Sequence, residues 1–379
     1  MKKFSFEVLH KSKKGRRGRI ITPHGAIETP AFVPVATKAT LKGLTPQQAN
    51  EIPIQSSFVN SYHLALSPGM STIEKHGGVH AMSGLNYPLM CDSGGFQIFS
   101  LGKADNKQKA RVRGEEEPFM VKKTNEEVIF RSPYNGETIT FNPKTSIAYQ
   151  HTIGADMFMA FDECIYAYAT HKYADEATER THTWLNQCIA EHSKNNPKGQ
   201  ALYGVIQGGM YEDLRVASAN FVTKAQVSGI AIGGVSVGET KHEMREQVAW
   251  VAHYLPDDRP VHLLGVGQID DIVDLVQYGI DTFDCVEPTR LARTGVLYNT
   301  RAAVLDRKNT YTFDIAKSNY ATDTSKVDDT CACYTCTHFS KAYVHHLFKQ
   351  KELLGYTLAS IHNLTVMEKL MQKIREELE

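Results

Sequence analysis

The stretch YGIDTFDCVEPTRLARTGVLY occupies residues 278–298 and joins an apolar segment to a basic one. It predicts a short buried strand over 282–285 that presents Asp284, followed by a loop that carries Arg290 and Arg293. A carboxylate on an apolar strand is costly to bury unless it is paired or used in chemistry. Two arginines in one loop can hold an anion such as a phosphodiester. We therefore expect Asp284 to act as a nucleophile and the loop to bind nucleic acid.

Further apolar segments have the same character, and each closes on polar residues or glycine. Amphipathic helical patterns separate most of them, as at 176–192, 242–255 and 269–279. Strands that are buried on both faces and joined by helices are typical of a (β/α)8 barrel, which is the α/β fold class we predict. A doubly wound open sheet would give similar local patterns and stays an alternative. The eight predicted strands are 31–37, 57–66, 87–95, 156–164, 201–209, 229–234, 261–267 and 281–288.

Two segments extend this barrel pattern. The basic run KSKKGRRGR at 11–19 is predicted to be a solvated loop or sheet edge, and the alternating segment after it to be an N-terminal β-hairpin that leads into the first strand. An insertion at about 101–150 contains a charged stretch and a hairpin over 130–141, with Asn135-Gly136 at its tip.

The overall composition limits the possible partners and compartments. The 379 residues include 42 basic and 42 acidic side chains, so any contact with nucleic acid must come from local basic patches. The N-terminus lacks a signal-peptide pattern, and no stretch approaches the ~18 uninterrupted apolar residues of a membrane helix. Seven cysteines, three of them close together, favour metal or catalytic use in a reducing compartment over a disulfide framework. We predict a cytoplasmic protein that makes no contact with a membrane.

Active sites of (β/α)8 barrels lie at the carboxyl ends of the strands, so polar residues there are candidates. Asp92, Asp162 and Asp284 each fall at such an end, although each alone could accept backbone hydrogen bonds in a turn. A purine edge needs mixed donors and acceptors. A carboxylate accepts the N–H groups of guanine, and the Gln207 amide can donate to its carbonyl. Phe96 could stack on the base, although most buried phenylalanines belong to the core.

Exchange at a glycosidic bond requires two carboxylates with different duties. One attacks the anomeric carbon, while the other protonates the leaving group and later acts as a base, so that two displacements retain the configuration. Carboxylates that crowd one another differ in pKa, because one of them stays protonated. The aspartates at the strand ends therefore suit this chemistry.

The hexapeptide CACYTC at 331–336 places three cysteines close together. The C-x-C-x-x-C spacing indicates a metal site, and tetrahedral thiolate ligation favours one structural zinc ion per chain. An unligated cysteine-rich loop is the alternative. We predict a catalytic barrel over 1–300 and a zinc-binding subdomain with C-terminal helices over 301–379. The candidates for the fourth ligand are His338, His345, His346 and His362.

Read in order, the motifs resemble those of a known family, the tRNA-guanine transglycosylases of bacterial type, also called queuine tRNA-ribosyltransferases. An ordered set that covers nearly the whole chain is far more specific than any single motif. The set comprises RGRIITPHGAIETPAFVPVATKATLKGLTP, NSYHL, CDSGGFQ, MAFDEC, GVIQGG, AIGGVSVGE, LLGVG, FDCVEPTR, C-x-C-x-x-C and ASIHNL.

The resemblance implies a reaction and a set of residue roles. The reaction replaces the wobble guanine of tRNAs with GUN anticodons by 7-aminomethyl-7-deazaguanine, without ATP or a redox cofactor, in an enzyme that is generally a homodimer. Asp284 is similar to the nucleophile that bonds to the ribose, Asp92 to the general acid/base, and Glu239 to the support of the peptide that senses the base. The other implied contacts are Asp92, Phe96, Asp162, Cys164, Gln207, Gly234, Val235 and Leu264 with the base, Arg290, Arg293 and Asp271 with tRNA, and Cys331, Cys333, Cys336 and His362 with zinc.

The chain departs from the family pattern at a few positions. Gln268 and Thr294 replace a lysine and an asparagine, which bears on contacts with the anticodon loop, and the charged stretch 102–117 is longer than expected. Cys164 and Val237 match the bacterial pattern that favours the small aminomethyl base. From the residues alone, two other functions stay open. One is a retaining glycoside or nucleoside hydrolase, and the other is a non-catalytic RNA-binding module built around the zinc site.

Overall fold

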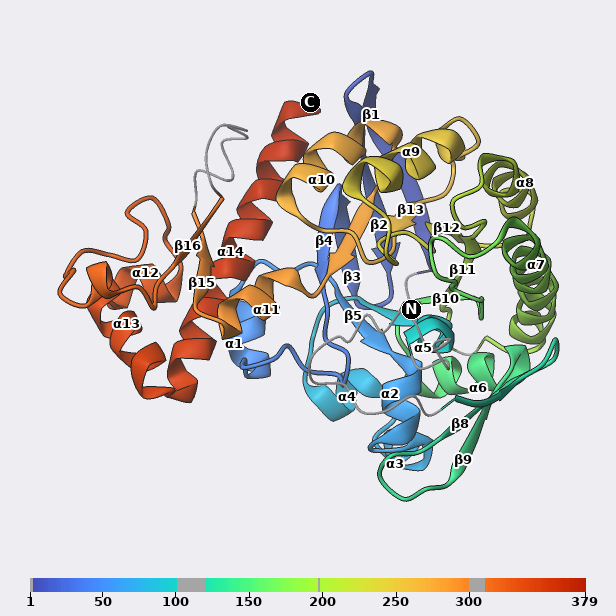
Figure 1. Cartoon of the computed structure of the whole chain (residues 1–379), viewed down its shortest axis with the longest axis horizontal. Coiled ribbons are helices and arrows are strands. Elements are labelled where there is room, and N and C mark those ends of the chain that lie inside the picture. Colours follow the sequence, from blue (N-terminus) through green and yellow to red (C-terminus); the bar gives the residue numbers. More distant parts are fainter. Residues whose placement is uncertain (1–2, 101–119, 197, 300–310) are drawn as a thin grey trace. The chain divides into compact units, whose positions relative to one another are not determined.

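The computed structural model describes residues 3–100, 120–196, 198–299 and 311–379. The largest sheet in the described residues has eight strands (Figure 1). Each strand lies inside one of the eight predicted segments and is shorter than predicted. The strands are β4 (Ala31–Pro34), β5 (Ser57–Asn60), β6 (Leu89–Asp92), β10 (Met157–Met159), β11 (Ala201–Ile206), β12 (Gly229–Ile232), β13 (Val261–Leu263) and β14 (Thr282–Cys285).

The strands of this sheet are hydrogen-bonded in the order β4-β14-β13-β12-β11-β10-β6-β5. A parallel bridge between Val35 and Phe58 connects the segments at the two ends of that order, so the sheet is a nearly closed barrel. Strands that follow one another in the sequence are also neighbours in the barrel, as repeated βα units require. The predicted (β/α)8 barrel is therefore confirmed over the open doubly wound sheet.

Helices connect the strands, and local capping explains where several of them begin. For α9, Thr240 and Glu243 form a capping box in which each side chain accepts a hydrogen bond from the other residue's backbone N–H group. The helices α7 and α8 pack beside β11 (Figure 1). The connecting helices are α1 (Pro46–Glu51), α2 (Ser61–Leu66), α3 (Met70–Lys75), α4 (Val79–Ser83), α5 (Phe96–Ser100), α6 (Pro143–Ile153), α7 (His171–Lys194), α8 (Glu212–Val222), α9 (Lys241–Ala252), α10 (Ile269–Leu275) with the short η1 (Val276–Tyr278), and α11 (Glu287–Arg293).

An antiparallel sheet precedes the barrel, with one strand more than the predicted hairpin. Its strands are β1 (Ser5–Ser12), β2 (Gly15–Thr22) and β3 (Gly25–Thr29). Arg16 on β2 is only 3% exposed, and its guanidinium forms an ion pair with Asp281, immediately before β14. The prediction of a solvated basic run is therefore wrong for Arg16, because a buried carboxylate neutralises its charge.

A second antiparallel sheet lies within the predicted insertion and consists of β7 (Met120–Lys123), β8 (Val128–Arg131) and β9 (Thr138–Phe141). The pairing of β8 with β9 confirms the predicted hairpin, and Gly136 at its tip has a φ angle of 74° that favours glycine. The charged stretch 102–117 lies outside the described residues.

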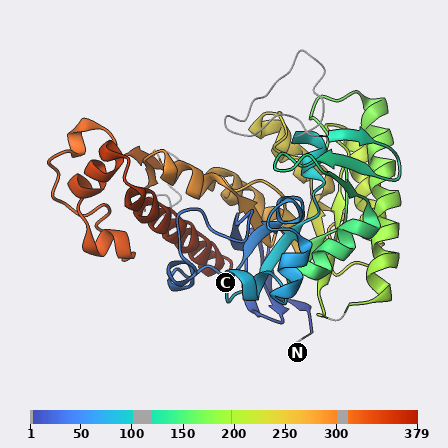
Figure 2. The same ribbon diagram turned by 90° about the horizontal axis from the view of Figure 1, so that it is seen from below.

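A small sheet and a group of helices follow the barrel in the sequence. Helices α12 and α13 pack against α14, the long dark red helix in Figure 2. Asn363 of α14 accepts a hydrogen bond from Tyr298 N at 2.8 Å and donates one to Pro288 O at 2.9 Å, which joins this helix to the chain after β14. The elements are β15 (Val296–Tyr298), β16 (Thr312–Asp314), η3 (Ser318–Tyr320), α12 (Tyr334–His338), α13 (Lys341–Gln350) and α14 (Leu353–Glu377).

The chain consists of two compact units. The first comprises Val59–Met82 and Met90–Val261, and the second comprises Lys2–Phe58, Ser83–Leu89 and His262–Glu379. The domain boundary predicted near residue 300 stays a prediction. Among the helices that the structure describes, none is long and apolar enough to cross a membrane.

Candidate active site and metal-binding cluster

Asp92 is the last residue of β6, and a side chain from the end of β5 holds it. Asn60 Nδ2 donates to Asp92 Oδ2 at 2.6 Å. Asn60 is also the N-cap of α2, where its Oδ1 accepts from His63 N at 3.1 Å. The cap fixes the orientation of the carboxamide, so that its N–H group points at the carboxylate. Asn60 is the first residue of the motif NSYHL, to which the sequence gave no role in the site.

Asp162 follows β10 and is 5% exposed. Ser93 Oγ donates to its Oδ1 at 3.1 Å, and Gln207 Nε2 donates to its Oδ2 at 2.8 Å. A Cβ atom on Gly95 would overlap this carboxylate, so only glycine lets the segment after β6 pass so close to it. The structure thus brings together Asp162 and Gln207, which the sequence predicted to recognise a purine.

The surroundings of Asp162 determine its charge. Burial raises the pKa of Asp162 from 3.8 to about 6, and hydrogen bonds from Gln207 and Ser93 oppose the rise. Its carboxylate is therefore ionised at neutral pH and can accept N–H groups. Burial also raises the pKa of Cys164 well above its usual value, so this thiol stays protonated. Cys164 packs with Val237 in a small apolar cluster, as expected of two residues that line one pocket.

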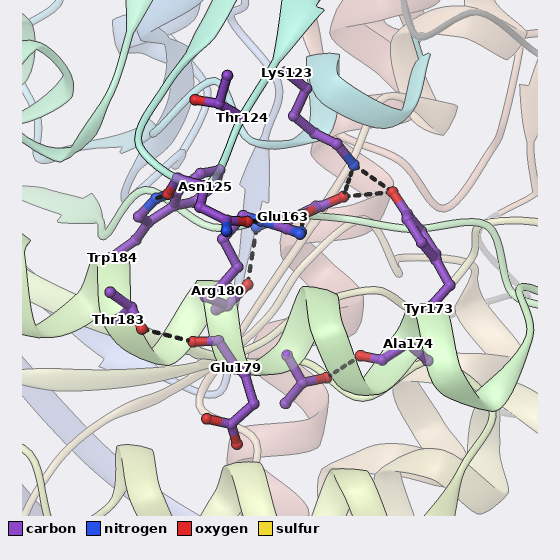
Figure 3. Close-up of polar contacts among 12 residues, drawn as sticks. Lys123, Thr124, Asn125, Glu163, Tyr173, Ala174, Glu179, Arg180, Thr183 and Trp184 are labelled. Carbon is purple, nitrogen blue, oxygen red and sulfur yellow. Dashed lines mark hydrogen bonds and ion pairs between the residues drawn. The ribbon is translucent and has the colours of Figure 1, made fainter.

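Glu163, which separates Asp162 from Cys164, lies at the centre of an ionic cluster (Figure 3). Its side chain is fully buried and pairs with Lys123 of β7 and Arg180 of α7. Tyr173 OH donates to Glu163 Oε1 at 2.6 Å. The cluster fastens the insertion sheet and α7 to the segment that carries Asp162.

The loop after β12 contains Gly234 and Val235, and a carboxylate holds its continuation. Glu239 accepts hydrogen bonds from the backbone N–H groups of Ser236 and Val237, the latter at 2.8 Å. Val235 is 4% exposed. The side chain of Glu239 therefore supports this loop, while the predicted role of the supported peptide in sensing the base stays a prediction.

Asp284, on β14, is 7% exposed and accepts two hydrogen bonds on the same oxygen. The His262 ring lies with its Nε2 at 3.1 Å from Asp284 Oδ1, and Gly265 N donates to this oxygen at 2.8 Å. The ring of His262 is itself fixed, because its Nδ1 contacts Thr282 Oγ1 at 2.8 Å and its face stacks on Phe58. Both of these hydrogen bonds are made to Oδ1, and the predicted role of Asp284 as the nucleophile stays a prediction. The sequence predicted Asp284 but missed His262, which reads only as part of an apolar strand.

The two arginines of the opening stretch lie on α11 and not in a loop, so that prediction is wrong. Pro288 in the first turn presets the backbone for a helix. Arg290 is exposed, whereas Arg293 is half-buried and donates to Thr289 O at 2.8 Å.

Three further candidates lie at the starts of helices or the ends of strands. Phe96, the first residue of α5, is 45% exposed. Leu264 is half-buried directly after β13. Asp271 is buried in the first turn of α10. The contacts predicted for them, with the base for Phe96 and Leu264 and with tRNA for Asp271, stay predictions.

Cys331, Cys333, Cys336 and His362 form a buried cluster that could hold a metal ion, since their ligand atoms all lie within 4.8 Å of one another. His362 Nδ1 is 3.2 Å from Cys336 Sγ and 3.7 Å from Cys333 Sγ. On the other side of the ring, His362 Nε2 lies 2.8 Å from Tyr298 O. A proton on Nε2 would be held by this carbonyl, which leaves Nδ1 unprotonated toward the sulfur atoms, as metal ligation requires.

The fold also decides among the four histidines that were candidates for the fourth ligand. His338 Nδ1 lies 2.9 Å from Tyr334 O, and His345 Nδ1 lies 2.8 Å from Ile315 O. Among the described residues, His362 is the histidine that belongs to the cysteine cluster. Three thiolates and one imidazole in a closed arrangement are typical of a structural metal site.

A parallel barrel whose strands end in buried carboxylates, with a separate cysteine-histidine cluster, has the features of a barrel transglycosylase. Comparison with known sequences identifies the family within this class. Residues 11–379 match the family model described as Queuine tRNA-ribosyltransferase. The chain therefore belongs to the queuine tRNA-ribosyltransferase family, a family of pentosyltransferases.

Several curated relatives support this assignment over nearly their whole length, and each is called Queuine tRNA-ribosyltransferase. The protein of Roseiflexus sp. (strain RS-1) is 41% identical over 387 residues, covering 99% of this chain and 95% of its own. That of Nostoc sp. (strain PCC 7120) is 43% identical over 375 residues, with coverages of 98% and 93%. That of Francisella tularensis subsp. novicida (strain U112) is 42% identical over 374 residues, with coverages of 99% and 94%.

Proposed function

We propose that this chain exchanges the wobble guanine of tRNAs with GUN anticodons for 7-aminomethyl-7-deazaguanine, a precursor of queuosine. The observation that carries the proposal is the family match over residues 11–379. The buried pair of Asp162 and Gln207 supports it, because a carboxylate beside an amide complements the edge of guanine.

Base recognition follows from the chemistry of this pair. The Asp162 carboxylate accepts the ring N–H and the exocyclic amino group of guanine. Gln207 Nε2 has a second N–H group besides the one given to Asp162, and it donates to the base carbonyl together with the peptides of Gly234 and Val235. Phe96 and Leu264 stack on the two faces of the ring.

The exchange proceeds by two displacements at the ribose. Asp284 attacks the anomeric carbon, the bond from that carbon to the guanine nitrogen breaks, and Asp92 as general acid gives the leaving nitrogen a proton. Asp92, now a carboxylate, removes the corresponding proton from the incoming base. That base displaces Asp284 and restores the configuration. Asn60, at 2.6 Å from Asp92, orients the acid/base, and His262 orients the nucleophile.

Several finer points belong to the same proposal. Cys164 and Val237 form the wall that favours the small aminomethyl base. Arg290, Arg293 and Asp271 contact the anticodon region of tRNA, with the arginines compensating phosphate charge. The enzyme acts as a homodimer in the cytoplasm, where reducing conditions keep its thiols free.

The cysteine-histidine cluster is proposed to bind one zinc ion, held by Cys331, Cys333, Cys336 and His362. Bound there, zinc would supply structural cross-linking of a subdomain that covers 301–379. Purified protein should contain about one zinc per chain. A Cys333→Ser protein that keeps both its zinc and its melting temperature would overturn this assignment.

The central test is exchange of radiolabelled guanine into defined tRNAs, with candidate deazaguanines as competitors. Incorporation into GUN tRNAs, and not into a tRNA whose wobble guanine is replaced by adenine, is expected. Net loss of guanine without exchange would indicate a hydrolase instead. Full binding of tRNA without turnover would indicate a non-catalytic RNA-binding protein.

A further inference from the structure

Arg215 of α8 is a fully buried cation whose hydrogen-bond partners are all neutral. Its side chain is 0% exposed. Within the described part of the chain, Nε donates to Gly209 O at 2.9 Å, Nη1 to Gly233 O at 2.6 Å, and Nη2 to both Gly234 O and Gln247 Oε1 at 2.6 Å. A buried guanidinium normally pairs with a carboxylate, because burying an uncompensated charge is costly. Burial lowers the pKa of Arg215, and the carboxylate of Glu239, which supports the same loop, opposes this shift without a hydrogen bond to the guanidinium. The hydrogen bonds of the guanidinium are therefore directed at the neutral groups around it.

Two of these acceptors belong to consecutive peptides of the loop after β12. The carbonyl of Gly233 shares its peptide unit with the N–H group of Gly234, and the carbonyl of Gly234 shares one with the N–H group of Val235. A charged donor on a carbonyl fixes the plane of that peptide and polarises it, so that its N–H group becomes a stronger donor. The planar guanidinium of Arg215 thus orients and polarises the N–H groups of both Gly234 and Val235.

Gly234 packs closely against the side chains of Gln207 and Arg215. Gly234 has a φ angle of 62°, and an added Cβ atom would overlap Gln207 Oε1 and lie 3.4 Å from Arg215 Nη2. Gln207 Oε1 is buried without a hydrogen-bond partner among the described residues. Through its Nε2, the same Gln207 holds Asp162. Arg215 therefore lies directly behind the loop and amide that border the base-binding aspartate.

Gln247, the fourth acceptor of Arg215, supports the view that the charge of Arg215 is directed at the loop. Gln247 Oε1 accepts from Arg215, while its Nε2 contacts Met210 Sδ at 3.0 Å and Glu243 O at 3.3 Å. A glutamate of the same shape could accept the same hydrogen bond and would also neutralise the guanidinium. With an amide at this position, the positive charge stays directed at the two loop carbonyls.

We infer that Arg215 is a positioning residue that orients and polarises the N–H groups of Gly234 and Val235 toward the carbonyl of a bound purine. The inference rests on the proposed function, in which this loop binds the base. It differs from a purely structural role in one respect. If Arg215 only stabilised the loop, its hydrogen bonds would be sufficient. Polarising the N–H groups of Gly234 and Val235 also requires the positive charge of the guanidinium.

Two variants of the full-length protein separate these roles, with the KM for guanine, the KM for tRNA and the melting temperature as readouts. Arg215→Lys keeps the charge but cannot span two carbonyl oxygens, and it should raise the KM for guanine about tenfold with an unchanged KM for tRNA. Gln247→Glu keeps the shape but neutralises the guanidinium. It should raise the KM for guanine several-fold, while any change in melting temperature reports separately the lost donation from residue 247 to Glu243 O.

Arg16→Lys is the matched control, because Arg16 is a buried arginine paired with Asp281 outside the proposed site. It should lower the melting temperature and leave the KM for guanine unchanged. If Gln247→Glu keeps the wild-type KM for guanine, the inference is overturned, whether or not Arg215→Lys folds. Absence of guanine exchange by the wild-type protein would instead contradict the proposed function itself, so the two failures are distinguishable.

Discussion

Asp162 and Asp284 are both buried at strand ends, at 5% and 7% exposure, yet their hydrogen bonds are distributed differently. Asp162 receives side-chain donors on both oxygens, from Ser93 and from Gln207. Asp284 receives both of its donors, His262 and Gly265 N, on Oδ1 alone.

This difference in hydrogen bonding supports the two different roles that we propose for carboxylates at equivalent positions of the fold. Donors on both oxygens hold the plane of Asp162 and suit a group that recognises a ligand without reacting. Donors on one oxygen fix Asp284 while the second oxygen keeps its electron pairs for a bond to carbon. In the proposed function, the distribution of donors, more than burial, distinguishes the recognition carboxylate Asp162 from the nucleophile Asp284.

The largest effect is expected where the comparison predicts bond formation. Asp284→Asn should reduce guanine exchange by roughly 10⁴-fold, because an amide cannot act as the nucleophile. No covalent RNA adduct should be trapped in a single-turnover incubation with GUN tRNA. Asp281→Asn is the control, since Asp281 is also buried but pairs with Arg16, and it should still form the adduct. An adduct in Asp284→Asn would assign the nucleophile elsewhere.

Replacing Asp162 by asparagine should reduce activity less than the change at Asp284, and it should affect binding of the base and not bond formation. Asp162→Asn should raise the KM for guanine about 100-fold, because an amide leaves buried N–H groups of the base unpaired. The protein should still trap the covalent adduct, since Asp284 is intact. Equal loss of adduct formation in Asp162→Asn and Asp284→Asn would break the comparison.

Asp162→Asn should also fold without loss of stability at neutral pH. Burial raises the pKa of Asp162 to about 6, so the folded protein binds this proton more tightly than the unfolded chain. The resulting stabilisation is complete below the unfolded pKa of 3.8 and is lost as the pH rises through about 6. At pH 7.5, replacing the ionised group by an amide should therefore leave the melting temperature equal or higher.

The charge of Asp162 predicts how base binding depends on pH. Its carboxylate accepts N–H groups only when ionised, so the KM for guanine should rise as the pH falls below about 6, by up to about tenfold per pH unit. Asp162→Asn should lack this dependence. A wild-type KM that stays constant between pH 7.5 and pH 5 would contradict the assignment.

The smallest effect on activity is expected at the adjacent carboxylate, Glu163. Lys123→Met removes the ion pair between Lys123 and the buried Glu163 and should lower the free energy of unfolding by about 3 kcal/mol. The KM for guanine should change only a few-fold, because Glu163 stabilises the segment without facing the base. Lys122→Met, an exposed neighbour on the same strand, is the control and should leave both quantities unchanged. A large KM effect with normal stability would move Glu163 into the recognition set.

The sequence by itself determined the elements that depend on local pattern. Apolar segments that close on polar residues predicted all eight barrel strands, since burial on both faces leaves a continuous hydrophobic signal. The Asn135-Gly136 turn and the spacing of the three cysteines are equally local, because each depends on residues only a few positions apart. For the same reason Asp92, Asp162 and Asp284 could be assigned to strand ends.

Only the tertiary structure decided which residues are partners. The ion pair of Arg16 with Asp281 joins residues 265 positions apart, so the basic run around Arg16 reads as solvated in sequence. His362 was selected from four histidines because α14 presents it to the cysteines and Tyr298 O fixes its ring. The contacts of His262 with Asp284 and of Arg215 with the loop carbonyls have the same origin. Sequence patterns record burial and periodicity, whereas hydrogen bonds and charge compensation depend on distances that the folded chain alone sets.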